Sequence, residues 1–115
     1  MKVNGNRLWN SLMDMAKVGE TENGGNTRLA LTDQDVAGRN LLIEWASELN
    51  LVVKYDAIGN MFVQKSGIDQ SLQPIVMGSH LDTQPKGGRF DGIYGVLAGF
   101  EVLRWLCETE TQTYH

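Results

Sequence analysis

One histidine and two aspartates between Gly78 and Gly92 have the types and spacing of metal ligands. His80 is followed by Asp82, and Asp91 comes nine residues after Asp82. A neutral imidazole binds zinc and other first-row divalent metals. A ligating histidine usually donates its second ring N–H to an oxygen acceptor. Because residues i and i+2 of an extended segment project to the same side, we expect Asp82 to supply that acceptor.

Asp91 follows a loop that contains Pro85, Gly87 and Gly88. Such a loop can fold back, and a carboxylate there has two oxygens with which to bridge two metal ions. Two simpler interpretations remain open. His80 and Asp82 alone also fit an ordinary surface pair, because short motifs often match by chance. Asp91 also fits a helix N-cap, and this is compatible with the site because a helix start favours negative charge.

The elements that must position these residues are predicted from apolar spacing. One helix is expected over 5–17 and a second after Thr32 and Asp35, which resemble a capping box. Residues 51–55 alternate as in a strand, Gly59-Asn60 marks a turn, and 61–65 is the returning strand. The apolar run 75–77 predicts a central strand covered on both faces, with His80 just past its carboxyl end. This order predicts an α/β fold.

The last predicted helix, about 93–107, is apolar on most of its circumference. Glu101, Arg104 and Glu108 form its expected polar edge, and the remainder is expected to be buried. Gly95 and Gly99, four residues apart, predict close packing against the sheet. The three tryptophans have apolar neighbours at helical spacing and are expected in the core.

Composition argues against several classes of protein. The net charge is −4 and there is no basic block, so we expect no nucleic-acid partner. The sequence shows neither an apolar run long enough to cross a membrane nor a secretory signal, so a cytoplasmic location is expected. The single cysteine, Cys107, excludes an internal disulfide and is expected to be a small buried apolar residue.

From about Arg7 to about Trp105 the chain resembles the M20-type metallo-amidohydrolases. The resemblance is to the branch of N-carbamoyl-L-amino acid hydrolases, allantoate amidohydrolases and yeast-type β-ureidopropionases. The segments that carry it, besides 78–83 and 87–92, are Arg7-Leu8-Trp9, Gly24-Gly25-Asn26-Thr27-Arg28-Leu29, Asp56-Ala57-Ile58-Gly59-Asn60 and Gly95-Val96-Leu97-Ala98-Gly99.

The resemblance implies the N-terminal part of a zinc-exopeptidase-like, three-layer α/β/α catalytic domain. Residues 1–115 would be an incomplete catalytic domain without the lid and dimerisation domain. His80 would bind one of two divalent ions (Zn, Mn, Co or Ni), Asp91 would bridge both, and Asp82 would orient His80 in a catalytic role. The family's adjacent Glu-Glu pair and later histidine ligands have no counterpart here. Glu108 and Glu110 are not adjacent.

The implied reaction is metal-dependent hydrolysis of a non-peptide C–N bond in N-carbamoyl amino acids, allantoate or related ureido acids. The intact parent enzyme is expected to be a homodimer, and this chain alone is expected to be inactive. Two other functions stay open. The chain could be part of an M20-type aminoacylase or dipeptidase, or a small non-catalytic interaction module.

Overall fold

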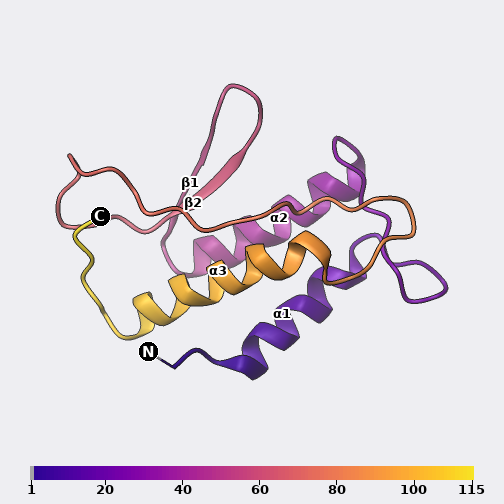
Figure 1. Ribbon diagram of the computed structural model, residues 1–115, viewed down its shortest axis with the longest axis horizontal. Coiled ribbons are helices and arrows are strands. Elements are labelled where there is room, and N and C mark those ends of the chain that lie inside the picture. The colour runs from indigo at the N-terminus through magenta and orange to yellow at the C-terminus, as the bar shows by residue number, and fades with distance from the viewer. Residues whose placement is uncertain (1) are drawn as a thin grey trace.

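The structure is a computed structural model that describes residues 2–115. Within that range the chain forms helices and a β-hairpin, so the predicted α/β class is confirmed (Figure 1). The elements, in chain order, are α1 (Gly5–Lys17), α2 (Asp33–Glu48), β1 (Val52–Tyr55), β2 (Met61–Gln64) and α3 (Asp91–Glu108). No described helix is both long enough and apolar enough to span a membrane.

Side-chain caps start the first two helices where the sequence predicted. Asn4 caps α1 by accepting a hydrogen bond from the Arg7 N–H at 3.0 Å. Thr32 caps α2 by accepting from the Asp35 N–H at 3.4 Å. The Asp35 carboxylate in turn accepts from the Leu31 N–H at 3.1 Å. Both arrangements satisfy backbone donors that a helix start leaves free.

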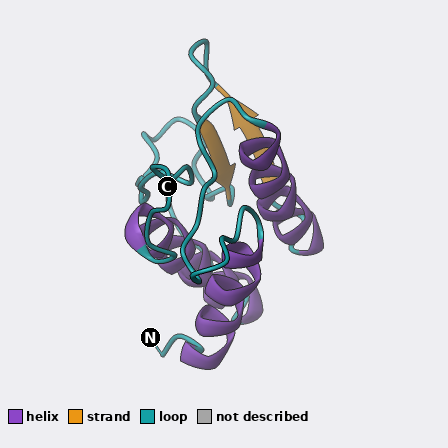
Figure 2. Ribbon diagram, turned by 90° about the vertical axis from the view of Figure 1, so that its right-hand side faces the viewer, coloured by secondary structure: helices purple, strands orange, loops and turns teal. Residues whose placement is uncertain are grey.

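The predicted hairpin is confirmed. Strands β1 and β2 pair antiparallel, with Val53 opposite Val63, and β1 packs beside α2 (Figure 2). Asp56 closes the turn by accepting from the backbone N–H groups of Ile58 and Asn60. The hydrogen bond from the Asn60 side chain, at 2.7 Å, lowers the pKa of the Asp56 carboxyl.

The buried apolar core joins all three helices to the segment that precedes α3. Helix α1 packs against α3, and Leu81 brings the chain between the hairpin and α3 into the same cluster. Leu81 lies between His80 and Asp82 in the sequence, so the core anchors the backbone between these two candidate residues. The buried members are Leu12, Met15, Leu42, Ala46, Leu81, Ile93, Leu97 and Phe100.

The predicted polar edge of α3 is partly wrong, because two of its three residues are buried. Glu101 is 1% exposed and accepts from Arg7 Nε at 2.9 Å and Nη2 at 2.7 Å. Arg104 donates to Ser11 Oγ at 2.7 Å. The hydrogen bond to Glu101 raises the pKa of Arg7, whereas burial lowers the pKa of Arg104. Glu108 pairs with Arg7 and is exposed, as expected.

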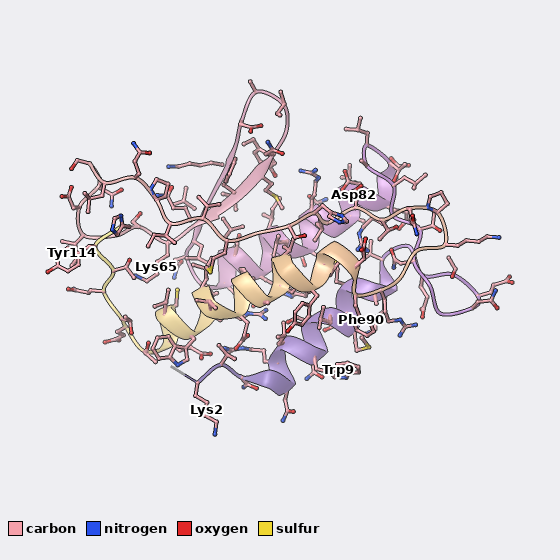
Figure 3. All side chains as sticks on the ribbon, in the orientation of Figure 1. Lys2, Trp9, Lys65, Asp82, Phe90 and Tyr114 are labelled. Carbon is pink, nitrogen blue, oxygen red and sulfur yellow. The ribbon has the colours of Figure 1, made fainter. Side chains whose placement is uncertain are left out.

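Two other expectations are wrong. Residues 75–77 form no strand, and Ile75 is 76% exposed. The reason is that no second described strand lies beside this segment to exchange backbone hydrogen bonds. Trp9 is 55% exposed rather than in the core. It stacks on Phe90, with ring centroids 5.9 Å apart, across the outer surface of α1 (Figure 3).

Candidate functional site

The imidazole of His80 lies between the two aspartates that the sequence singled out. Its Nδ1 atom is 3.0 Å from the backbone oxygen of Asp82 and 3.3 Å from Asp82 Oδ1. Its Nε2 atom is 3.6 Å from Asp91 Oδ2. The expectation that Asp82 accepts from His80 fits this geometry, and the nearer acceptor is the backbone carbonyl. With the proton on Nδ1, the unprotonated Nε2 is the ring nitrogen that lies 3.6 Å from Asp91 Oδ2.

Asp91 is the first residue of α3 and not its N-cap, which is Phe90. The prediction that Asp91 caps the helix is therefore wrong by one position. Its carboxylate faces His80 across the start of the helix. A carboxylate in the first helical turn is favoured by the helix dipole, so α3 both holds Asp91 and stabilises its charge.

The loop between Asp82 and Asp91 is held by a segment more than fifty residues earlier. Asn26 and Gly87 exchange two backbone hydrogen bonds, of 2.9 and 2.8 Å. The Thr83 N–H donates to the Arg28 carbonyl at 2.8 Å, and Thr83 Oγ1 accepts from the Arg28 N–H at 2.8 Å. We refer to this contact between residues 26–28 and 83–87 as the clamp. It fixes the start and the middle of the loop that separates the candidate ligands.

Arg28 anchors the clamp in the interior. Its side chain is fully buried and donates to the carbonyls of Met15 and Val18, which belong to the end of α1. Its Nε donates to the Leu81 carbonyl at 3.0 Å, so one guanidinium ties α1 to the residue between His80 and Asp82. Burial lowers the pKa of Arg28. Sequence reasoning noted this residue only as part of a family motif.

Arg89 holds the far side of the same loop. Its guanidinium donates to the Gly24 carbonyl, with Nε at 3.0 Å, and its Nη2 lies 3.8 Å from Glu20 Oε1. Gly24 has a φ of 72°, and a Cβ there would come within 2.9 Å of Arg89. The glycine thus allows both the left-handed backbone and the close approach.

The geometry of His80 and Asp91 fits two ligands of one metal ion. Metal–nitrogen and metal–oxygen bonds of about 2.0–2.2 Å at a tetrahedral angle place the two donor atoms about 3.4 Å apart. The observed Nε2–Oδ2 separation is 3.6 Å. Across residues 2–115, however, no three His, Cys, Asp or Glu side chains are grouped to hold a metal. Two donors fit, and the described chain does not complete the site.

The other acidic and histidine residues considered from the sequence lie elsewhere. Glu108 is bound to Arg7 near the far end of α3. The Nδ1 atom of His115 is 2.8 Å from the Gln73 carbonyl oxygen. Neither belongs to the cluster around His80.

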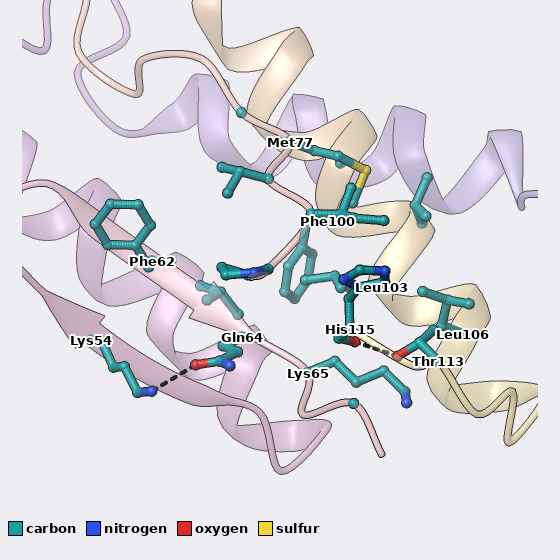
Figure 4. Close-up of a pocket in the computed structure, with 18 of the residues that line it drawn as sticks. Lys54, Phe62, Gln64, Lys65, Met77, Phe100, Leu103, Leu106, Thr113 and His115 are labelled. Atoms are coloured by element: carbon teal, nitrogen blue, oxygen red, sulfur yellow. Dashed lines mark hydrogen bonds between the residues drawn. The ribbon is translucent and has the colours of Figure 1, made fainter. Parts of the chain in front are cut away.

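A groove in the structure lies apart from this cluster. It has a volume of about 890 Å³ and lies between β2, the 67–79 segment and the apolar face of α3 (Figure 4). Phe62, Met77, Phe100 and Leu103 are among its lining residues, whereas His80, Asp82 and Asp91 are not. The polar geometry at the start of α3, and not the groove, therefore defines the candidate site.

The chain is similar to known amidohydrolases along almost its whole length. An N-carbamoyl-L-amino-acid amidohydrolase from Rhizobium meliloti is 47% identical over 114 residues, which cover 99% of this chain and 27% of that protein. An allantoate amidohydrolase from Bacillus subtilis (strain 168) is 38% identical over 104 residues, covering 87% of this chain and 25% of that protein. No protein-family model matches the chain.

The fold of the chain also matches that of a solved amidase structure. An amidase of the hydantoinase/carbamoylase family from Burkholderia multivorans superimposes with a TM-score of 0.96 at 55% identity, covering 99% of this chain and 28% of that chain. The chain spans about a quarter of the length of the relatives it matches. By sequence and by fold, its relatives are N-carbamoyl-L-amino-acid amidohydrolases and amidases of the hydantoinase/carbamoylase family.

Proposed function

We propose that this chain supplies part of the metal centre of an enzyme that hydrolyses the non-peptide C–N bond of N-carbamoyl amino acids or related ureido acids. His80 and Asp91 are the proposed ligands, with Asp91 shared between two divalent ions, and Asp82 orients His80. The relatives named as amidohydrolases support the reaction class.

One observation carries the proposal. The Nε2 atom of His80 and the carboxylate of Asp91 face each other at 3.6 Å, while Nδ1 lies against the Asp82 carbonyl. If Nδ1 carries the proton, two electron-pair donors, Nε2 and the Asp91 carboxylate, lie 3.6 Å apart. Such donors repel unless a cation lies between them, and a divalent metal ion is that cation in this proposal. The oxygen acceptor behind Nδ1 is the usual partner of a ligating histidine.

Asp82 and Asp91 have different proposed roles at His80. Asp82 holds the imidazole in the Nδ1–H tautomer, which leaves Nε2 free to bind. Asp91 offers two oxygens at the positive end of α3, where negative charge is stabilised. A divalent metal bound there supplies Lewis-acid polarisation of the scissile carbonyl and activation of a water molecule. Within residues 2–115 no third His, Cys, Asp or Glu is grouped with these two, so the proposal also requires further ligands and a general base supplied elsewhere in the assembled enzyme.

The proposed substrates are N-carbamoyl-L-amino acids, allantoate and similar ureido acids. Imidazole and carboxylate suit Zn, Mn, Co and Ni alike, so the proposed metal is one of these four. A homodimeric parent enzyme and a cytoplasmic location stay predictions from the sequence.

The test uses the native gene product, whatever its length. Metal-stripped protein is assayed on N-carbamoyl-L-amino acids and allantoate before and after each divalent metal is restored. We expect metal-dependent release of the carbamoyl nitrogen, lost in His80→Ala. His115→Ala is the matched control, because it removes a histidine that lies apart from the cluster. Turnover that survives chelation, or that His80→Ala leaves intact, would refute the proposal.

A further inference from the structure

We propose that Gly92 is a positioning residue for His80: its missing side chain leaves the space that the imidazole occupies beside Asp91. This inference rests on the proposed metal-binding role of His80. Gly92 is buried in the first turn of α3, directly after Asp91. A Cβ placed there would meet Cδ2, Nε2 and Cε1 of the His80 ring inside van der Waals contact. These are the three nearest atoms, so the ring itself fills the space.

The contact belongs to a longer close approach between α3 and the chain that precedes it. A Cβ at Gly95 would lie 2.8 Å from Ser79 Cβ, and one at Gly99 would lie 3.3 Å from Met77 Cβ. Residues 77–80 thus run antiparallel to α3, along one face that carries glycine at positions 92, 95 and 99. Gly95 and Gly99 do pack closely, but against residues 77–79, which form no strand, and not against the sheet as predicted. Gly92 extends this close approach to the candidate ligand.

The ring cannot keep its place by moving away from α3. On its other side, Nδ1 lies 3.0 Å from the Asp82 carbonyl oxygen. Asp82 itself stands between two buried residues, Leu81 and Thr83. Both of these are hydrogen bonded to Arg28, so the backbone behind the ring is fixed. A methyl group at position 92 would therefore turn the imidazole toward solvent and away from Asp91.

The choice of glycine has no backbone reason at this position. Gly92 lies in a helix, and its φ is not positive, unlike those of Gly19, Gly24 and Gly59. Alanine is the better helix former, so helix stability favours Ala, whereas the three atoms nearest to an added Cβ all belong to the His80 ring. Stability and metal binding therefore respond to Gly92→Ala in opposite directions, which separates positioning from a merely structural role.

The experiment compares wild type, Gly92→Ala and Gly5→Ala in the native gene product. Gly5 is the matched control, since it is in the first turn of α1 and a Cβ there meets nothing within 4 Å. Zinc affinity is measured by chelator competition, and thermal unfolding is measured on metal-free protein. We expect Gly92→Ala to lose zinc affinity by about 10- to 100-fold, as when a histidine ligand loses its orientation. Its metal-free melting temperature should stay level or rise, and Gly5→Ala should bind zinc as wild type does.

Three outcomes overturn the inference. One is zinc affinity in Gly92→Ala within twofold of wild type. Another is an equal loss of affinity in Gly5→Ala. The third is a fall in metal-free stability that accompanies the loss of affinity, because that indicates general disruption. If wild type binds none of Zn, Mn, Co and Ni, the proposed function fails instead. A crystal structure of metal-free Gly92→Ala then decides the positioning role, which an unmoved imidazole refutes and a displaced one supports.

Discussion

Replacing Thr83 by valine tests whether the clamp between residues 26–28 and 83–87 holds the candidate site in place. Thr83 is 4% exposed, and its hydroxyl accepts from the Arg28 N–H at 2.8 Å inside the protein. Valine keeps the shape of threonine and removes that acceptor. The Arg28 N–H is then buried without a partner, which costs about 1–3 kcal/mol.

Thr27→Val is the matched control on the same clamp. The Thr27 hydroxyl accepts from the Lys86 N–H at 2.9 Å, but this pair is exposed to solvent. Water replaces the lost hydroxyl there, so we expect a change within about 0.5 kcal/mol. The two Thr→Val changes should therefore differ by about 2 kcal/mol, or up to about 30-fold in the ratio of folded to unfolded protein.

Urea unfolding of the native gene product measures both variants. A lower midpoint for Thr83→Val at unchanged slope reports the loss of stability, because the slope tracks the surface exposed on unfolding. If the clamp sets the distance between His80 and Asp91, Thr83→Val should also lower the zinc affinity measured without urea. Two variants whose free energies of unfolding agree within about 0.5 kcal/mol would show that the clamp contributes nothing beyond its exposed hydrogen bonds.

Three further predictions concern charge and activity. Glu101→Gln should lower stability by about 1–3 kcal/mol, because a buried acceptor loses the charge of its hydrogen bonds from Arg7. Glu108→Gln, at an exposed position, should change stability far less, and equal effects of the two variants in chemical denaturation would contradict this. The pKa of Asp56 is lowered by its hydrogen bond from Asn60. Its contribution to stability is therefore present above the unfolded pKa, about 3.9, and is lost as the pH falls through the lower folded value. Asp56→Asn should flatten the acid side of a hairpin amide-exchange profile, and a profile parallel to wild type would refute that. The 115-residue chain alone should not hydrolyse N-carbamoyl-L-amino acids with added metal; turnover abolished by His80→Ala would prove this wrong.

Local patterns predicted the elements well, because each carries its own signal. Thr32 and Asp35 mark the start of α2 by hydrogen bonds within one helical turn. The alternation around Gly59 predicts the hairpin, whose strands are neighbours in sequence. The convergence of His80, Asp82 and Asp91 also followed, since all three lie within a dozen residues and one loop.

The sequence predictions failed where the structure depends on contacts between residues far apart in the sequence. A strand over 75–77 requires a partner strand, which lies nowhere in the described residues. Burial of Glu101 depends on Arg7, ninety-four positions away. Gly92 reads from sequence as one more helical glycine, and only the position of His80 gives it a role. A glycine directly after a candidate ligand at a helix start was the available signal.

The clamp also has a consequence for the order of folding. The hydrogen bond from the Arg28 N–H to Thr83 Oγ1 joins residues 55 positions apart. Closing a flexible loop of that length costs about 3.6 kcal/mol in chain entropy from its logarithmic term. Packing of α1 against Leu81 and Ile93 must offset that cost before the loop to Asp91 takes its shape. If a metal ion binds His80 and Asp91 as proposed, it meets two donor atoms that these contacts already hold 3.6 Å apart.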